Sequence, residues 1–378
     1  MTKMIKMSLV AAVAITGLSS TLAAKPLAEA IQDVDVSGSV VYRYNDYSDN
    51  EDTKDVNTNN YKIATSIKSK VNDYVTATVR VVTGTDITSN NSLTGLDTQT
   101  VADANPSLNV SQANFTVKTD VATVIAGKQG LTTPWTVAID SDGDEQTGTG
   151  LLALVPAGPV TFAAAYFNQT NLDTVKLGLD GSDHVATVGV LGSIDFVSFD
   201  AWYLDMDEVF DTYTLGAKAT IDMITAELRY TSLDLDGTDT DNNALMLKVG
   251  AKMDVFKLSA AYGMTDKDGG LTALDSDAKT TLTGWNVNLH NKADADMFML
   301  GAGMDVMSGL NVALNYNTID YGNTSATETT ETEVYTQITH KMGKNLVTYI
   351  RYGMLDKEVN DNDTIDATVG RLQVEYKF

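Results

Sequence analysis

The arginines of this 378-residue chain are few and share one kind of context. Each lies in a stretch where polar and apolar residues alternate, and the five are Arg43, Arg80, Arg229, Arg351 and Arg371. A guanidinium keeps its positive charge at any physiological pH. Five permanent cations confined to regular segments predict a fixed basic wall that attracts anions. The alternative is that some of them pair with nearby carboxylates and brace the structure.

Negative charge gathers in one segment that follows Arg80. Residues 129–150 contain no Lys or Arg but hold four carboxylates, at Asp140, Asp142, Asp144 and Glu145. Their spacing resembles the start of an EF-hand calcium loop, which needs Gly at position six and Glu at position twelve. Counting from Asp140, those positions hold Glu145 and Leu151, so the segment is not an EF-hand. It predicts at most a weak Ca²⁺ or Mg²⁺ site at Asp140, Asp142 and Asp144, with a solvated acidic loop as the alternative. We expect no other cofactor.

Other reactive side chains are sparse. The histidines His184, His290 and His340 are scattered and form no HExxH motif or triad order. The chain has no cysteine, which excludes disulfides, thiol catalysis and cysteine-based metal sites. A formal net charge of −24 makes nucleic acid a poor partner, because such binding needs cations against phosphates. The sequence therefore does not predict an enzyme.

The first 24 residues have the pattern of a secretory signal peptide. Lys3 and Lys6 precede an apolar stretch that ends near Leu22, and the small residues Ala23 and Ala24 follow. We expect residues 1–24 to be removed, which would take away two lysines and change the net charge from −24 to −26. Residues 25–378 would then form a single domain, and no stretch within them predicts a transmembrane helix.

Most of the remaining chain alternates between polar and apolar residues, which predicts strands with one face of each kind. One early apolar face consists of Val34, Val36, Val40, Tyr42 and Tyr44. Eight short breaks and nine longer polar breaks divide the chain and predict eighteen strands. An even number of antiparallel strands, with short turns at one end and long loops at the other, is typical of bacterial outer-membrane barrels. We therefore predict an all-β fold, a transmembrane antiparallel β-barrel of about 18 strands.

A soluble β-sandwich or a secreted adhesin would alternate as well. Two features favour the barrel. Lys62, Lys68 and Arg80 lie on the polar faces of strands that are too numerous for one sandwich. The alternation also continues to the end of the chain, where Tyr376 and Phe378 have the apolar parity. A terminal aromatic residue fits the interface girdle of a membrane barrel, so we interpret these two residues as a C-terminal assembly signal.

The barrel would bring most of the arginines together. Counted from the short-turn ends at about 3.3 Å per residue, all five lie near mid-height. Barrel closure would place Arg351 and Arg371, on the last two strands, beside Arg43 and Arg80 on the first three. A charge that faces lipid at mid-height costs about 2–4 kcal/mol, which favours the lumen.

Three segments resemble one known family. They are Leu27 to Gly38 with the following Tyr42-Arg43-Tyr44, Val124 to Thr136, and Val374 to Phe378. On these segments the chain is similar to the Campylobacter-type major outer membrane protein, a porin family of epsilonproteobacteria. The resemblance implies a homotrimeric general diffusion porin whose third long loop folds into the barrel and constricts the lumen. Trp135 of that loop would anchor it against the barrel wall or, alternatively, belong to an interface girdle.

The same resemblance sets the expected function. The four carboxylates of the third loop would face the basic wall across the constriction. We expect passive diffusion of inorganic ions and small polar solutes across the outer membrane of a Gram-negative cell, in contact with its lipid. The net negative charge predicts a moderate cation preference. A substrate-specific channel, and a surface adhesin that uses acidic external loops, are the alternatives.

Overall fold

The structure is a computed structural model, and it describes residues 34–49, 55–84, 97–99, 107–172, 181–322 and 327–378. The expected signal peptide, residues 1–24, lies outside the described residues. No helix in the described part of the chain is long and apolar enough to cross a membrane.

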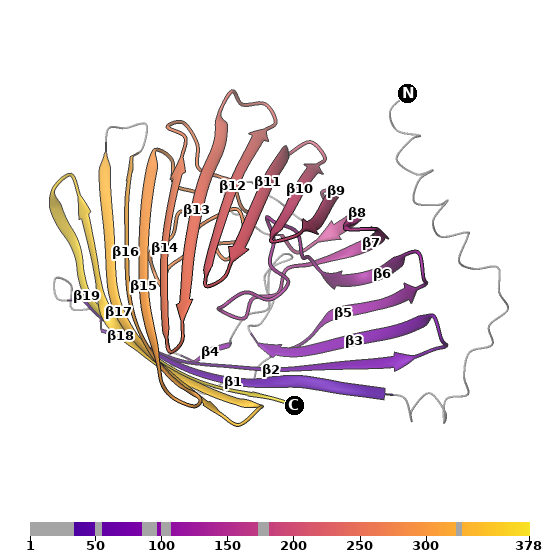
Figure 1. The fold of residues 1–378 in the computed structure, drawn as a ribbon, viewed down its shortest axis with the longest axis horizontal. Helices are drawn as coiled ribbons and strands as arrows, with labels where there is room; N and C mark the ends of the chain where they lie inside the picture. Colours follow the sequence, from indigo (N-terminus) through magenta and orange to yellow (C-terminus); the bar gives the residue numbers. More distant parts are fainter. Residues whose placement is uncertain (1–33, 50–54, 85–96, 100–106, 173–180, 323–326) are drawn as a thin grey trace.

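Nineteen strands form one antiparallel sheet (Figure 1). The first ten are β1 (Val34–Asp49), β2 (Val56–Lys70), β3 (Val75–Gly84), β4 (Asp97–Gln99), β5 (Ser107–Lys118), β6 (Thr123–Gly130), β7 (Thr147–Ala157), β8 (Val160–Thr170), β9 (Val185–Ile194) and β10 (Val197–Met206). The others are β11 (Phe210–Ile221), β12 (Ile224–Leu235), β13 (Asp241–Met253), β14 (Phe256–Thr265), β15 (Ala295–Met307), β16 (Leu310–Gly322), β17 (Glu328–Met342), β18 (Leu346–Val359) and β19 (Asn362–Lys377).

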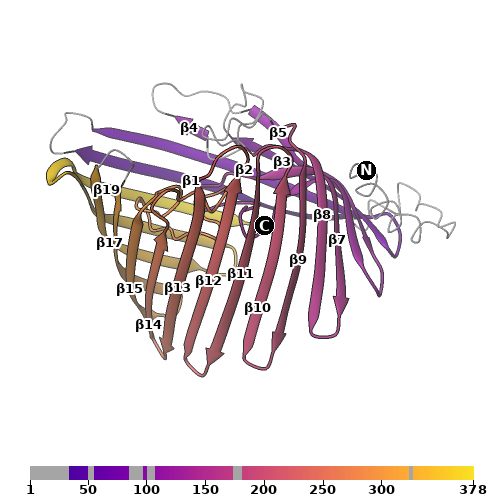
Figure 2. The same ribbon diagram turned by 90° about the horizontal axis from the view of Figure 1, so that it is seen from above.

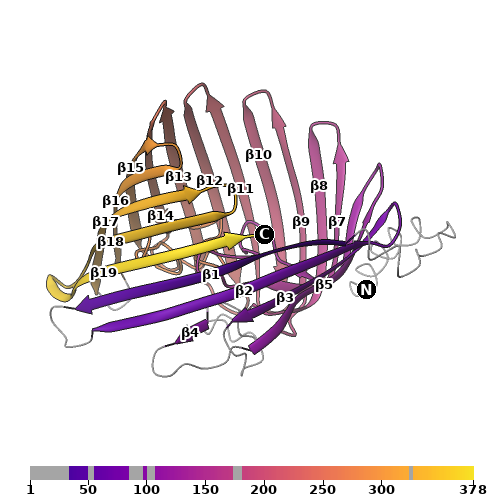
Figure 3. The ribbon, with the colours of Figure 1, turned by 90° about the horizontal axis from the view of Figure 1, so that it is seen from below.

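Eighteen of these strands close into a barrel. The three-residue β4 pairs only with β2, while every other strand pairs with its neighbours along the chain. The last strand then returns to the first, and β1 and β19 pair from Ser39 opposite Lys377 to Asp49 opposite Ala367. Figure 3 shows β19 beside β1. The closed sheet confirms the predicted barrel of eighteen antiparallel strands.

At the end where the sequence predicts short breaks, tight turns join all the strand pairs. At the other end most connections are longer, but residues 207–209 and 360–361 form short turns where the sequence predicts long loops. Several of these turns use a left-handed residue, such as Asp195, Asp222 and Gly309, with φ of 52°, 50° and 81°. Asp and Gly adopt this conformation more readily than other residues. Figure 2 shows the short turns of β7–β8, β9–β10, β11–β12 and β13–β14 along one edge of the barrel.

The outer surface is apolar. Alternate residues of the strands expose large hydrophobic side chains, for example Leu228 of β12, Leu247 of β13, Leu258 of β14 and Leu300 of β15. Water would disfavour a continuous surface of this kind, whereas an outward apolar band suits contact with lipid. The alternation seen in the sequence therefore separates an outer apolar face from an inner polar face.

Two long connections occupy the interior. We call residues 131–146, between β6 and β7, the third loop, and residues 266–294, between β14 and β15, the seventh loop. Both contribute to buried apolar clusters, the third loop through Leu131 and Trp135 and the seventh through Leu271, Leu274 and Leu282 among others. Both lie within the ring of strands in Figure 1. The family resemblance implies this placement for the third loop only.

The C-terminal residue is paired with the first strand. The amide of Gly38 donates to the Phe378 carbonyl at 2.9 Å, and the Phe378 amide donates to the Gly38 carbonyl at 3.0 Å. A Cβ atom on Gly38 would lie 2.6 Å from the Phe378 ring, so this close approach requires glycine. The rings of Tyr376 and Phe378 stack with centroids 6.2 Å apart and stay partly exposed. Their role as an assembly signal stays a prediction.

Candidate functional site

The tip of the third loop meets the barrel wall through Asp142. Its Oδ1 lies 2.5 Å from Nη1 of Arg43 and 3.4 Å from Nη1 of Arg371. Arg43 also donates from Nη2 to the Ser141 carbonyl at 2.7 Å and from Nε to Gln373 at 2.8 Å. The Arg43 side chain is 5% exposed, but that of Asp142 is 60% exposed. One carboxylate therefore stays open to the lumen while two arginines lie behind it.

A second carboxylate of the loop is buried among cations. Glu145 is 1% exposed and accepts from Nε and Nη2 of Arg80 at 3.0 and 2.8 Å. Its Oε1 also lies 2.8 Å from Nζ of Lys62, which in turn donates to the Gly143 carbonyl. Burial alone would raise the pKa of Glu145, but the hydrogen bonds from Arg80 and Lys62 and their charges hold it below its usual value. Glu145 therefore anchors the C-terminal end of the third loop to the barrel wall through ion pairs.

Strand register explains why these cations meet. Asn45 of β1 lies opposite Arg371 of β19, and Arg371 lies opposite Arg351 of β18. The first and last strands thus bring Arg43, Arg351 and Arg371 onto one inner surface, while Arg80 follows from β3, opposite Ser66. Like charges directly opposite one another are destabilising in a sheet, so the wall needs compensating partners.

Aromatic rings supply part of that compensation. The Arg351 guanidinium lies 5.0 Å from the ring centroid of Tyr349, 5.6 Å from that of Tyr335 and 5.7 Å from that of Trp285. Cations over aromatic faces are attracted by the ring quadrupole. Arg371 lies 5.7 Å from the same Trp285 ring. A tryptophan of the seventh loop therefore covers both arginines of the last two strands.

Glu333 holds the tip of the seventh loop in place. This β17 residue is 1% exposed, and its carboxylate accepts from the amides of Trp285 and Asn286 at 2.6 and 2.8 Å. The side-chain amide of Asn317 donates to it as well, at 2.7 Å. A buried carboxylate that accepts several hydrogen bonds fixes the groups that donate them. The position of Trp285 over the arginines depends on this contact.

The two inner loops are also bound to each other. The Leu274 amide donates to the Trp135 carbonyl at 2.9 Å, and Gln146 donates from its side chain to the Leu274 carbonyl at 2.7 Å. Trp135 has no exposed surface and packs with residues of both loops and of the inner barrel wall. The ring therefore lies inside the barrel and not in an outward interface girdle, and the role of Trp135 as an anchor stays a prediction.

Arg229 lies apart from the other arginines. Its Nη1 and Nη2 donate to the two carboxylate oxygens of Asp200 at 2.9 and 2.7 Å, and the side chain is 4% exposed. The contact passes over Gly216, where a Cβ atom would lie 2.3 Å from Nη2. The prediction that Arg229 belongs to the basic wall is therefore wrong. Its strand, β12, lies far around the barrel from β1, and its partner Asp200 is on β10.

Three carboxylates come together where the loops meet. Ligand oxygens of Asp140, Asp275 and Asp277 lie within 4.8 Å of one another. Burial, with repulsion from neighbouring carboxylates, raises the pKa of Asp140 from 3.8 to about 7 and that of Asp275 to about 6. Oxygen donors of this kind suit a hard cation such as Ca²⁺.

This set differs from the predicted set in two of its members. Asp142 contacts the arginines instead, and the amides of Asp142 and Asp144 donate to Asp140 at 2.9 and 2.8 Å. Sequence spacing selected neighbours along the chain, while the structure selects Asp275 and Asp277 from the seventh loop.

Several site residues are not among those predicted from the sequence, which are mainly arginines and residues of the third loop. Lys62 carries the same charge as the arginines and has the inner parity, so it could have been included. The seventh loop contained a usable signal as well, because Leu271, Leu274 and Leu282 are unusual in a long solvated loop. Glu333 gave no signal, since the seventh-loop amides that donate to it are 48 and 47 residues away in the sequence.

Comparison with known proteins decides the family. The profile of the Campylobacter major outer membrane protein family matches residues 2–378. The chain belongs to this family. This outcome confirms the resemblance seen in three short segments of the sequence and extends it over the whole chain. A search of curated proteins found no match.

Solved structures share the fold of this family member. Pseudomonas aeruginosa OccK5 (OpdH) superposes with a TM-score of 0.74 at 15% identity, covering 92% of this chain and 98% of that chain. Acinetobacter baumannii OccAB4 gives 0.70 at 14%, with the same coverage. Pseudomonas aeruginosa OccK2 (OpdF), solved in complex with glucuronate, gives 0.71 at 14% and covers 91% and 98%. At these identities the likeness shows the fold. Family and fold together support an outer-membrane porin channel.

Proposed function

We propose that this major outer membrane protein is a general diffusion porin with a moderate preference for cations. The observation that carries the proposal is the exposed carboxylate of Asp142, held in the barrel interior by Arg43 and Arg371. Ions and small polar solutes would pass down their gradients beside this group. Charged side chains at a narrow point bias which ions pass. The third and seventh loops would form the constriction.

The preference for cations rests on a balance of charge. The cations that contact the third loop are paired in part, because Arg43 and Arg371 share Asp142, and Arg80 and Lys62 share Glu145. The carboxylate cluster of Asp140, Asp275 and Asp277 has no arginine or lysine in an ion pair with it among the described residues. The formal net charge of the whole chain is −24, and an excess of carboxylates attracts cations and raises their local concentration.

Measurement in a planar bilayer tests the proposal. The purified protein, reconstituted in a salt gradient, should give single-channel steps and a reversal potential of the sign for cations. An anion-selective reversal potential would contradict the preference, and an absence of conductance would contradict the channel itself. We also propose a homotrimer, for which closure under high voltage should occur in three equal steps.

A substrate-specific channel is the second candidate. The wall of Arg351 and Arg371 with Trp285 favours it, because cations beside aromatic rings can order a solute instead of only filtering it. A specific channel would show saturable flux for one solute class. A general porin would show flux that rises in proportion to concentration and falls with solute size.

We further propose a weak Ca²⁺ site at Asp140, Asp275 and Asp277. Carboxylates are hard oxygen ligands, and Ca²⁺ needs six to eight of them, so water would complete the shell. A cation there would relieve repulsion at the junction of the two loops.

A further inference from the structure

A cavity of about 1130 Å³ lies on the short-turn side of the inner loops. Its lining comes from the inner faces of strands between β2 and β13, with Thr132, Thr133 and Pro134 of the third loop and Lys279 of the seventh loop. Lys218 and Glu227, both close to the short turn around Asp222, also contribute. The cavity is distinct from the contacts of Asp142 and Glu145 described above.

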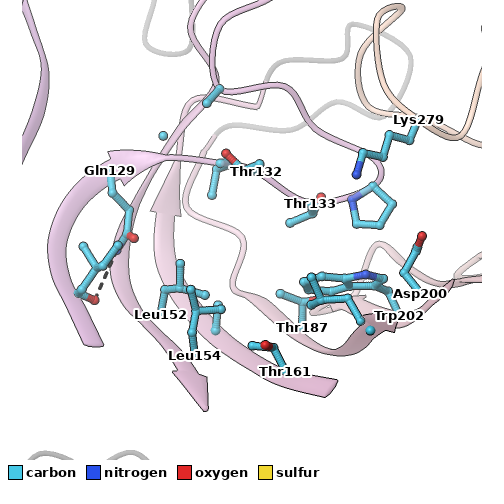
Figure 4. A pocket seen from close by; sticks show the side chains of 18 of the residues that line it. Gln129, Thr132, Thr133, Leu152, Leu154, Thr161, Thr187, Asp200, Trp202 and Lys279 are labelled. Carbon is cyan, nitrogen blue, oxygen red and sulfur yellow. Dashed lines mark hydrogen bonds between the residues drawn. The ribbon is translucent and has the colours of Figure 1, made fainter. Parts of the chain in front are cut away.

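One wall of this cavity is apolar, which is unexpected inside a barrel. Leu152 and Leu154 of β7, Leu191 of β9 and Trp202 of β10 line it. Figure 4 shows Leu152, Leu154 and Trp202 along one side and Lys279 on the other. The interior of a membrane barrel is ordinarily polar and wet. A contiguous apolar surface rimmed by polar groups marks a binding groove.

The charged residues of the lining are mostly cations. They are Lys68, Lys218, Lys248, Lys279, Arg229, Asp200 and Glu227. Within the described part of the chain, Arg229 forms an ion pair, with Asp200, and the four lysines form none. Glu227 lies opposite Lys218 on one side and Lys248 on the other in the strand register. Positive charge is therefore in excess, beside the apolar wall.

We propose that this cavity binds amphipathic monoanions, solutes with a flat apolar body and one carboxylate or sulfonate group. The body would lie against Leu152, Leu154 and Trp202, and the anionic group would face Lys248 and Lys279. Neither feature selects this class alone, because a small anion gains nothing from the apolar wall and an aromatic cation is repelled by the lysines. The inference rests on the channel function proposed above and adds a binding step to it.

Single-channel recording with three matched probes tests the inference. Naphthalene-2-sulfonate combines the body and the anion, methanesulfonate keeps only the anion, and 2-naphthylmethylammonium keeps the body with a positive charge. At equal millimolar concentration, naphthalene-2-sulfonate should interrupt the potassium chloride current with dwell times about tenfold longer than either other probe. Equal dwell times for all three would overturn the inference. Failure of the channel function is distinguishable, since it would abolish the potassium chloride current itself.

Two double variants locate the site. Lys248→Gln with Lys279→Gln removes the cations, and Leu152→Thr with Leu154→Thr removes apolar contact while keeping branched or small side chains suited to a strand. Each should shorten naphthalene-2-sulfonate dwell times about tenfold with potassium chloride steps retained. Lys341→Gln is the matched control, because this exposed β17 lysine is outside the cavity lining, and it should leave the dwell times unchanged. Dwell times equal to wild type in both double variants would overturn the proposed site.

Discussion

At the scale of single residues, Glu145 is a buried carboxylate whose charge must be balanced by neighbouring cations. Its buried carboxylate is surrounded by Arg80 and Lys62, and all three side chains are almost excluded from solvent. Desolvation of charges is costly, and only good geometry with several hydrogen bonds offsets it. Removing the carboxylate would leave two buried cations facing each other without a partner.

Glu145→Gln should therefore destabilise the folded barrel by about 3–5 kcal/mol, the usual cost of breaking one half of a buried pair. Urea unfolding in detergent, followed by intrinsic fluorescence, would measure the change. Asp305→Asn is the control, because it removes an exposed partner of Lys257 and should change stability little. Equal effects of the two substitutions would show that the Glu145 pairs contribute no more than a surface contact.

Protonation of the carboxylates at the loop junction should stabilise the folded protein, whereas protonation of Glu145 should destabilise it. The raised pKa of Asp140, about 7, means that the folded protein binds this proton more tightly than the unfolded chain. The contribution of Asp140 to the stability of the folded state is fully present when the pH is below its ordinary pKa of 3.8. This contribution is lost as the pH rises through the folded-state pKa of about 7. The lowered pKa of Glu145 contributes stability above its ordinary value, which is lost as pH falls through the folded value.

Lowering the pH from about 7.5 to about 5.5 without divalent ions should thus raise the thermal midpoint, and Asp140→Asn should reduce that rise. Added Ca²⁺ should stabilise the protein more at the higher pH, because protons compete with the metal for the same oxygens. Differential scanning calorimetry with Ca²⁺ or a chelator would measure both effects. A chelator that changes nothing at the higher pH would contradict the metal site.

At the scale of elements, alternation in the sequence predicts the strands well and the inner loops only in part. Polar and apolar residues alternate in a strand such as β12 because one face contacts lipid and the other faces the lumen. This pattern is local, so it can be recognised in the sequence. The position of the seventh loop depends on contacts between distant residues, such as Glu333 with Trp285. The partner of Arg229 is likewise set by β10, two strands away. No local pattern encodes such pairs, although the leucines of the seventh loop indicated burial.

The seventh loop should become more mobile when its hydrogen bonds to Glu333 are weakened. Glu333→Gln keeps the side-chain size but replaces a charged acceptor of several hydrogen bonds with a neutral group that accepts through one oxygen. We expect noisier single-channel current and more frequent brief closures, since Trp285 would no longer be held over the arginines. Glu328→Gln, at the exposed start of β17, is the control. If neither variant increases current noise or brief closures, the contact between Glu333 and the seventh loop does not control the channel.

At the scale of the whole molecule, ion preference is the sum of all lumen charges, and Arg351 offers the cleanest way to change that sum. Its charge lies near three aromatic rings and forms no ion pair with any carboxylate in the described residues, so neutralising it breaks no salt bridge. The same substitution at Arg43 or Arg80 would release a loop carboxylate and alter the loop as well as the charge.

Arg351→Gln should therefore raise the permeability of K⁺ relative to Cl⁻, by about twofold at 0.1 M salt, where charges act over about 10 Å. The reversal potential in a salt gradient measures the ratio, and the shift should shrink at higher salt as screening increases. Lys344→Gln removes one positive charge from an exposed short turn and should leave the ratio nearly constant. If Arg351→Gln and Lys344→Gln shift the ratio equally, net charge and not the position of the basic wall controls selectivity.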